Sequence, residues 1–195
     1  MNRRVFFLDA AKGFLSALVM FVILMSLFIN ANVASGSMES TLNIGDRLLC
    51  FRHAYVLSSP KRGDIILFKL PEDNRLLIKR VIAIPEDEVE IKEGEVLING
   101  ELHVEDYVTG ETVCLSEYQH VILGDNEYFV MGDNREHSTD SRVFGPINSS
   151  YIKAKLLFSY STSQFLMVVG VSFAVLFSVY FLKKRSELWR KKIVT

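Results

Sequence analysis

Two adjacent basic residues, Lys79 and Arg80, interrupt one of the most apolar segments of the chain, residues 76–84. If this segment is a β-strand, Lys79 shares one face with Leu77, Val81 and Ala83, because alternate side chains point to opposite faces. Burial there disfavours the charged ammonium group and lowers its pKa. Lowering a lysine pKa from ~10.4 to ~8 costs about 3 kcal/mol, and the resulting neutral amine can act as a general base. The alternatives are an edge-strand lysine whose ammonium reaches water, or an ion pair with an acidic neighbour.

Two further motifs contain serine residues, one directly after an apolar segment and one within a polar, charged run. The run Ser35-Gly36-Ser37-Met38 directly follows a long apolar segment, and its Ser37 is a candidate catalytic serine. The run 132–142, GDNREHSTDSR, combines glycine, small polar residues and alternating charge after a strand-like segment. This second run predicts a tight loop braced by hydrogen bonds and ion pairs. Taken alone, the first motif also fits the polar end of an apolar segment, and the second also fits an ordinary surface loop.

Two long uncharged segments predict where these motifs lie. Residues 13–38 and 156–182 carry no charge, and each is longer than the ~20 residues that cross a bilayer as a helix. We therefore predict transmembrane helices at 13–34 and 161–182. Basic residues flank the outer end of each segment, which predicts that both termini, 1–12 and 183–195, are cytoplasmic and that 35–160 lies outside the cell membrane. The alternative for the first segment is a cleaved signal peptide, but the segment exceeds the roughly 7–15 apolar residues of an ordinary one.

The formal net charge of −1 hides a separation of charge along the chain. Residues 35–160 contain 13 basic and 21 acidic residues, whereas residues 183–195 contain six basic residues and one acidic residue. An acidic domain without a basic stripe argues against nucleic acid as a partner. The basic C-terminal tail fits contact with anionic lipid, so the lipid bilayer is an expected partner.

The middle of the chain predicts a mostly β domain. Short runs rich in Ile, Leu, Val and Phe alternate with turn sequences, and the predicted strands are 47–51, 64–70, 76–84, 88–91, 95–98 and 127–131. Asn99-Gly100 predicts a hairpin between 95–98 and 101–104, since both residues tolerate positive φ. No helical period is present in this region. The expected fold is a small antiparallel β-sheet domain between an N-terminal and a C-terminal transmembrane helix.

The cysteine and histidine residues add little. Cys50 and Cys114 lie in the predicted outer domain, where a disulfide is permitted and two buried free thiols are an equal alternative. The four histidines are scattered without ligand spacing, so no metal site is predicted. No cofactor is expected.

Five short segments follow one another between residues 13 and 155. They are SGSMESTL (35–42), RGDIILF (62–68), LIKRVIAIPED (77–87), VLINGELHVEDYV (96–108) and MGDNREHSTDSR (131–142). In this order they resemble the segments of type I signal peptidases, the membrane-anchored serine proteases that remove signal peptides from exported proteins. One such segment could arise by chance, but five in order are specific to the family.

The resemblance implies a role for each matching residue. Ser37 would be the nucleophile and Lys79 its general base, as in the Ser-Lys variants of the catalytic triad. Ser138 would hold the lysine amine in line, and the hydroxyl of Ser35 would bind the oxyanion together with the backbone N–H of Ser37. Four charged residues would form structural ion pairs that position the loop carrying Ser138, namely Arg80, Asp133, Asp140 and Arg142.

The resemblance also implies the substrate, a preprotein with a signal peptide that the secretion machinery has translocated. The substrate would add as an extended strand beside residues 77–78, with backbone bonds giving affinity, and would be cut after a small-x-small motif. Five apolar residues would line its shallow pockets or belong to the core instead: Val33, Met38, Leu42, Leu77 and Ile78.

The chain departs from the usual family pattern near the candidate nucleophile. Ala34 and Ser40 stand where the family usually has proline, and Pro85-Glu86-Asp87 replaces a more usual Pro-Gly-Asp. The loss of both prolines is expected to loosen the turn around Ser37 without removing a catalytic atom. The base position holds lysine, as in the bacterial type, and not the histidine of the endoplasmic-reticulum and archaeal type.

Other classes of protein fit the sequence less well. A self-cleaving repressor would need a DNA-binding helix pair and a soluble chain, and a receptor ectodomain would not explain five ordered segments. The sequence leaves open the oligomeric state and whether the substrate range is general or dedicated. The main alternative is a non-catalytic homologue that assists assembly or chaperones a few exported proteins. Such a homologue would be expected to lose Ser37 or Lys79, and both are present.

Overall fold

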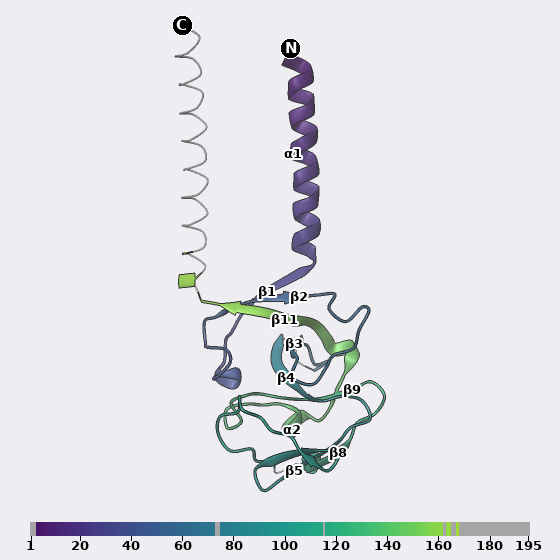
Figure 1. The fold of residues 1–195 in the computed structure, drawn as a ribbon, viewed down its shortest axis with the longest axis vertical. Helices are drawn as coiled ribbons and strands as arrows, with labels where there is room; N and C mark the ends of the chain where they lie inside the picture. Colours follow the sequence, from purple (N-terminus) through teal and green to yellow (C-terminus); the bar gives the residue numbers. More distant parts are fainter. Residues whose placement is uncertain (1–2, 73–74, 115, 162, 165–166, 168–195) are drawn as a thin grey trace. The chain divides into compact units, whose positions relative to one another are not determined.

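The computed structural model describes residues 3–72, 75–114, 116–161, 163, 164 and 167. The chain divides into a unit of residues 1–159 and a unit of residues 160–195. The first unit contains the N-terminal helix α1 (Arg3–Ser26) and the β domain (Figure 1). The predicted helix at 161–182 and the basic tail at 183–195 lie outside the described residues, apart from 161, 163, 164 and 167.

The N-terminal helix differs from its predicted boundaries. It begins at Arg3, ends at Ser26, and is followed by strand β1 (Phe28–Asn32) instead of continuing to residue 34. The prediction was wrong at this end because an uncharged run does not distinguish a helix from a strand. Pairing with β2 (Arg47–Phe51) makes residues 28–32 extended. Among the described residues, no helix combines the length and the apolar character required of a membrane span.

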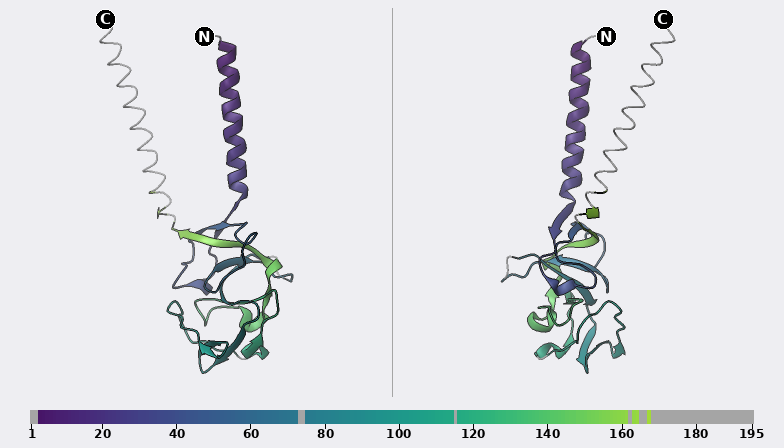
Figure 2. Two further views of the ribbon diagram at one scale, coloured as in Figure 1. Left: turned by 45° about the vertical axis from the view of Figure 1, so that its right-hand side comes forward. Right: turned by 90° about the vertical axis from the view of Figure 1, so that its left-hand side faces the viewer.

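A seven-stranded sheet forms the larger part of the β domain, with strands in the order β1-β2-β11-β3-β4-β9-β10. Its remaining strands are β3 (Ile65–Phe68), β4 (Leu77–Ala83), β9 (Glu127–Met131), β10 (Ile147–Asn148) and β11 (Ile152–Tyr160). The late strand β11, light green in Figure 2, lies between the early strands β2 and β3, so the sheet joins segments from both ends of the domain. The strand that carries Lys79 is therefore central, with β3 on one side and β9 on the other.

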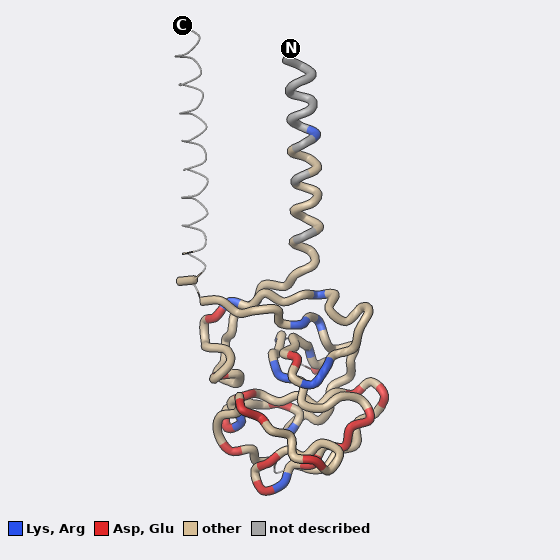
Figure 3. The backbone as a smooth tube through the Cα atoms, viewed as in Figure 1, with Lys and Arg blue, Asp and Glu red and all other residues tan. Residues whose placement is uncertain are grey.

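A second, four-stranded sheet follows the order β7-β6-β5-β8. Its strands are β5 (Glu88–Lys92), β6 (Glu95–Ile98), β7 (Glu101–Leu102) and β8 (His120–Ile122). Asn99 and Gly100 connect β6 to β7 with φ of 55° and 80°, the positive values of a type I′ hairpin turn. Figure 3 shows acidic residues concentrated in the part of the domain that carries this sheet.

The mostly β character and all six predicted strands are confirmed. Three of them, β2, β6 and β9, have the predicted boundaries, and the other three differ by a few residues at their ends. The sequence interpretation missed β1, β8, β10 and β11. It also missed a short helix, α2 (Ser141–Phe144), and three 3-10 turns: η1 (Gly36–Met38), η2 (Glu117–Gln119) and η3 (Ser149–Tyr151). These elements are too short for a periodic signal, or they depend on a distant partner strand.

Three apolar clusters form the core. One cluster lies against the second sheet and contains Phe129 and Cys114. Another gathers Met38, Leu42 and Cys50 beneath the turn η1. A third lies around Phe68 and Val130. Cys50 and Cys114 belong to different clusters and are both buried free thiols, which decides between the two alternatives left by the sequence.

Candidate active site

Ser37 and Lys79 meet inside the β domain. The amine Nζ of Lys79 donates a hydrogen bond of 2.6 Å to the hydroxyl Oγ of Ser37, across 42 residues of sequence. Each residue is 4% exposed. Ser37 is carried by η1, and Lys79 by the central strand β4. The two buried side chains are therefore in direct contact through a hydrogen bond, and they do not form an ion pair because the serine hydroxyl is uncharged.

The surroundings of Lys79 weaken its charge. Burial lowers the pKa of Lys79 from its usual value of 10.5 to about 8, because an ammonium group loses hydration in the protein interior. The carboxylates of Asp140 and Asp133 act in the opposite direction, and the cation of Arg142 adds to the lowering. A large share of the protein therefore carries a neutral lysine near pH 8, and a neutral amine can accept a proton.

The turn that carries Ser37 is held from below by apolar packing. Met38 is fully buried and Leu42 is 1% exposed, in the same cluster as Val33. The backbone N–H of Glu39 donates to the carbonyl of Gly36 at 3.1 Å, closing the 3-10 turn. Ser35 precedes this turn in extended conformation and is exposed. Ser35 is exposed to solvent on one side of Ser37, and Met38 is buried in the core on the other. Between them, the Ser37 side chain faces β4 and contacts Lys79.

An ion pair joins the strand of Lys79 to the loop after β9. The guanidinium group of Arg80 contacts both carboxylate oxygens of Asp133, at 2.8 Å and 2.5 Å. The hydroxyl of Thr41 donates to the same carboxylate and accepts from Arg80. Burial lowers the pKa of Arg80, but the carboxylate of Asp133 outweighs that effect and the net shift is upward. This cluster fixes the strand, the loop and the Ser37 turn relative to one another.

A second ion pair braces the interior of the 132–142 loop. Asp140 is fully buried and accepts from the backbone N–H of Gly132 and from the guanidinium Nε of Arg142, at 3.0 Å and 2.9 Å. It also caps α2 by accepting from the backbone N–H of Arg142. Burial raises the pKa of Asp140, but the hydrogen bond from Arg142 more than reverses this, so the carboxyl remains ionised.

Gly132 is the point where the loop and the Ser37 turn come into closest contact. A Cβ atom built on Gly132 would lie 2.2 Å from the Oγ of Ser138 and 2.4 Å from the backbone carbonyl oxygen of Ser37. The same carbonyl accepts a hydrogen bond of 3.2 Å from the backbone N–H of Asn134. Only glycine leaves enough room for these two serines to approach.

Ser138 lies beside this contact, but its hydroxyl is not bonded to Lys79. The Oγ atom is buried and makes no hydrogen bond of normal geometry within the part of the chain that the structure describes, although it lies close enough to the carboxylate of Asp140 to help lower the pKa of that group. The sequence-based expectation placed this hydroxyl on the lysine amine. The structure brings Ser138 to the site through Gly132 and shows no bond between the two side chains.

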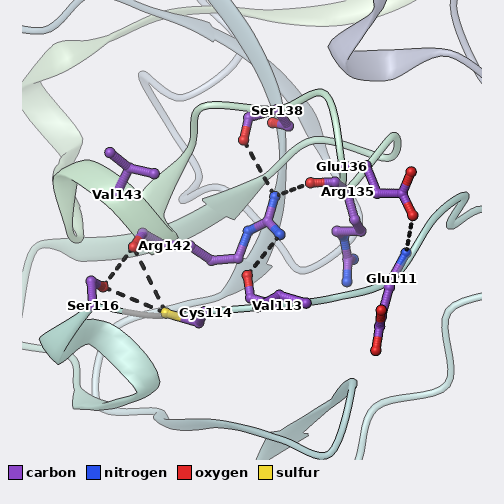
Figure 4. Close-up of a pocket in the computed structure, with 9 residues that line it drawn as sticks. All are labelled: Glu111, Val113, Cys114, Ser116, Arg135, Glu136, Ser138, Arg142 and Val143. Atoms are coloured by element: carbon purple, nitrogen blue, oxygen red, sulfur yellow. Dashed lines mark hydrogen bonds between the residues drawn. The ribbon is translucent and has the colours of Figure 1, made fainter.

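A pocket of about 590 Å³ lies beyond the loop, with Ser138 on its wall. Figure 4 shows the guanidinium group of Arg142 at the centre of this pocket, bonded to the backbone carbonyls of Val113, Arg135 and Ser138. The carboxylates of Glu111 and Glu136 lie at one side. The guanidinium group of Arg142 donates its hydrogen bonds to Asp140 and to these carbonyls. This wall of the pocket is therefore part of the hydrogen-bond network that holds the 132–142 loop.

Sequence analysis gave no role to the residues of segment 105–112, here called the strap, although 105–108 belongs to the quoted segment VLINGELHVEDYV (96–108). Arg135 donates to the Glu105 carboxylate and to the Thr112 hydroxyl, at 2.6 Å and 2.8 Å. The ring of Tyr107 lies 3.9 Å from the guanidinium carbon of Arg80. Arg135 stands in a motif that was singled out, but the strap has no periodicity that marks it, because its contacts with Arg80 and Arg135 join residues far apart in the sequence.

The five apolar residues predicted to line substrate pockets are divided by the structure. Four lie in one cluster: Val33, Met38, Leu42 and the half-buried Ile78. Leu77 packs against the cluster around Phe68 instead, as expected for adjacent residues of a strand. The first three are buried in the described structure, so they form the floor beneath the Ser37 turn.

The edge of β4 next to Lys79 is open on one side. Pairing between β4 and β9 begins at Arg80, opposite Met131, whereas pairing with β3 extends back to Leu77. Among the described strands, none pairs with residues 77–79 on the β9 side. An extended peptide has space to form backbone hydrogen bonds at this edge.

No three His, Cys, Asp or Glu side chains within the described ranges are grouped as metal ligands.

Comparison with known proteins identifies the family of the chain. Residues 8–161 match the family described as signal peptidase, peptidase S26. A probable signal peptidase I-2 of Synechocystis sp. is 34% identical over 145 residues, which cover 71% of this chain and 66% of that protein. Signal peptidase I V of Bacillus subtilis is 32% identical over 78% of this chain and 95% of its own length.

One solved structure also matches part of the chain. The crystal structure of a signal peptidase I from Enterococcus faecalis V583 is 32% identical, with a TM-score of 0.45, over 51% of this chain and 97% of that chain. The assignment to a family rests on the sequence matches, which extend over most of the chain. The chain belongs to the signal peptidase family, peptidase S26.

Proposed function

We propose that this protein is a serine endopeptidase that removes signal peptides from exported preproteins, with Ser37 as nucleophile and Lys79 as general base. The observation that carries the proposal is the 2.6 Å contact between the buried Nζ of Lys79 and the Oγ of Ser37. The lowered pKa of Lys79, about 8, supports it. A serine hydroxyl needs an adjacent base to become an effective nucleophile.

The chemistry follows from these two groups. Neutral Lys79 takes the proton of Ser37 while Oγ attacks the scissile carbonyl, and the resulting ammonium then protonates the departing amine of the mature protein. A water molecule, deprotonated by the same lysine, hydrolyses the acyl-enzyme and regenerates Ser37. The oxyanion is bound by the backbone N–H of Ser37 and the hydroxyl of Ser35. The exposure of Ser35 beside the turn supports this role, and one such donor is typically worth about 2.7–4 kcal/mol.

Ser138 completes the site as a positioning hydroxyl in this proposal. Among the described residues its buried Oγ makes no hydrogen bond of normal geometry and has only the nearby carboxylate of Asp140 to interact with, and an unsatisfied buried hydroxyl is costly. A rotation of this hydroxyl towards the lysine amine during the reaction would satisfy both groups. The ion pairs Arg80–Asp133 and Arg142–Asp140 hold the loop from which Ser138 projects.

The substrate binds as a strand along the open edge of β4. The free side of residues 77–79 supports this placement, and strand addition provides affinity through the backbone. The half-buried Ile78 and the apolar floor of Val33, Met38 and Leu42 leave only shallow space beside Ser37. Small side chains before the cleavage point fit this space, which matches the small-x-small rule of signal peptides.

Membrane attachment is part of the proposal. Helix α1 has 24 residues, about 36 Å at 1.5 Å per residue, and its apolar side chains Phe14, Met20 and Val22 are all more than half exposed. Such a helix is stable when its apolar surface contacts lipid. We place α1, and a second segment at 161–182, in the cell membrane, with both termini cytoplasmic and the β domain outside.

The test is cleavage of a preprotein with an Ala-x-Ala site by the full-length protein in lipid vesicles. Ser37→Ala and Lys79→Met are each expected to lower kcat by about 10³-fold or more, since each removes an essential half of the dyad. Ser58→Ala and Lys153→Ala are the matched controls: Ser58 only donates to a loop carbonyl and Lys153 to the carbonyl of Ser150.

The outcomes separate the two candidate functions. Cleavage by the parent and both controls, with loss in both dyad variants and unchanged thermal unfolding, supports the proposal. A parent that binds precursors but cuts none of several tested would contradict it. That result would favour the second candidate, a non-catalytic assembly factor or chaperone for a few exported proteins.

A further inference from the structure

The turn directly after Ser37 has a backbone conformation that few residues adopt. Glu39 has φ −57° and ψ 145°, Ser40 has φ 91°, and the N–H of Thr41 donates to the carbonyl of Met38 at 3.1 Å. These values describe a type II turn over residues 38–41, whose third position requires positive φ and usually holds glycine or asparagine. A serine there is sterically disfavoured and needs a compensating contact.

The compensating contact is a hydrogen bond to the strap. The hydroxyl of Ser40 donates to the backbone carbonyl of Tyr107 at 2.6 Å, across 67 residues of sequence. The strap is itself fixed to the 132–142 loop, because Thr109 donates to the carbonyl of Asp133 and Arg135 donates to the carbonyl of Thr109, both at 2.9 Å. The Ser37 turn is thereby connected to the loop that carries Ser138.

The strap also contacts the strand that carries Lys79. The ring of Tyr107 lies 3.9 Å from the guanidinium carbon of Arg80, a distance typical of a cation–π contact. Arg80 is the neighbour of Lys79 in β4. The backbone of Tyr107 therefore contacts the turn that carries Ser37, and its ring contacts the strand that carries Lys79.

We propose that Ser40 and Tyr107 form a clamp that sets the position of the Ser37 turn relative to Lys79, so that Ser40 is a positioning residue for peptide cleavage. This inference rests on the proposed function. A proline at position 40 would have φ near −65° and could not adopt the φ of 91° that Ser40 has. It would also lack the hydroxyl that bonds to the carbonyl of Tyr107.

The test compares four variants of the full-length protein in lipid vesicles with an Ala-x-Ala preprotein. Ser40→Gly keeps the positive φ and removes the hydroxyl, and we expect kcat to fall about tenfold while KM changes less than about threefold. Ser40→Pro removes both features and is expected to lose about 10²-fold in kcat, the effect of a misplacement near 1 Å. Ser40→Asn tolerates positive φ and offers an amide donor, so it should recover kcat to within about threefold of the parent. Ser58→Gly removes a similar serine-to-carbonyl bond far from the dyad and should change neither constant.

Amide hydrogen exchange provides a readout that does not depend on cleavage. Loss of the clamp in Ser40→Gly should speed exchange about tenfold in residues 38–42 and in the strap, with the 52–60 loop unchanged. Unchanged exchange in both segments would overturn the clamp, even if the parent proves inactive and the proposed function fails. The clamp would also be overturned if the parent is active and Ser40→Gly has an unchanged kcat, whether or not its KM changes.

Discussion

The two segments that meet at Gly132 are held in opposite ways. The Ser37 turn rests on apolar side chains, with Met38 and Leu42 buried beneath it. The 132–142 loop instead buries four charged residues, all of them bonded: Asp133, Arg135, Asp140 and Arg142. Apolar packing is non-directional, so it tolerates small shifts of the turn. Charged hydrogen bonds have strict geometry, so the loop has essentially one arrangement.

This difference assigns separate tasks to the two segments. A buried ion pair contributes little net stability, because desolvation offsets attraction, but losing one partner is severe. The loop is thus a rigid reference against which Lys79 and Ser138 are placed. The turn is the adjustable partner, and its position depends on contacts with the loop and the strap.

The largest expected effect comes from breaking the loop. Asp140→Asn keeps the side-chain shape but leaves the buried guanidinium of Arg142 without its charge partner. We expect the free energy of unfolding to fall by about 3–5 kcal/mol, measured by urea denaturation. Glu88→Gln is the control, because its side-chain contact with His120 is largely exposed and even an exposed ion pair is worth at most about 1 kcal/mol. A loss below about 1 kcal/mol for Asp140→Asn would show that the loop is not braced by charge.

A comparable but differently caused loss is expected in the turn. Leu42→Ala removes a side chain that is 1% exposed, and such deletions cost about 2–5 kcal/mol in unfolding free energy. The loss should be independent of salt. Ile44→Ala, two residues later and 61% exposed, should cost little. If Leu42→Ala keeps its stability but changes the preferred residue before the cleavage point, Leu42 lines a substrate pocket and is not core.

The contact between the two segments is tested at Gly132. Gly132→Ala would push its methyl group against the hydroxyl of Ser138 and the carbonyl of Ser37, and we expect kcat to fall about 10²-fold from misplacement alone. Gly124→Ala is the control, since its Cβ would meet only the flexible carboxylate of Glu127 at 3.4 Å. Full activity of Gly132→Ala in the preprotein assay would mean that the turn and the loop are positioned independently.

The last expected effect is the pH dependence set by Lys79, about tenfold for each pH unit. With a pKa of about 8 in the folded protein, kcat/KM should rise about tenfold per pH unit below pH 8 and level off above it. A flat profile between pH 6 and 9 would argue against a lysine base.

Stability should depend on pH through the same group. Below pH 8 Lys79 is charged in both states, and burying the ammonium lowers stability. Between about 8 and 10.5 the unfolded chain binds more protons than the folded one, so the free energy of unfolding rises with pH in this window. The comparison of parent with Lys79→Met isolates this effect from Cys50, whose pKa burial raises to about 12. Equal slopes for the two proteins would contradict the assignment.

The sequence by itself determined the local features of this protein. Alternating apolar runs predicted six strands, and Asn99-Gly100 predicted the β6–β7 turn. A lysine on an apolar stripe marked Lys79 as a candidate buried base, beside an exposed or ion-paired alternative, and the structure has it 4% exposed. The order of five segments indicated the family, which the match over residues 8–161 confirms. Each of these signals lies within a few residues of sequence, where side-chain alternation and turn chemistry act directly.

Only the tertiary structure decided how distant segments meet. Strand β11 lies between β2 and β3. The strap contacts both Ser40 and Arg80. At Gly132, Ser37 and Ser138 are so close that a methyl group would not fit between them. None of these contacts has a periodic or compositional signal, because a hydrogen bond between residues 67 apart depends on where both backbones have already been placed. The residue types that permit the chemistry are therefore readable in the chain, whereas the ångström-scale distances that the chemistry requires arise from packing.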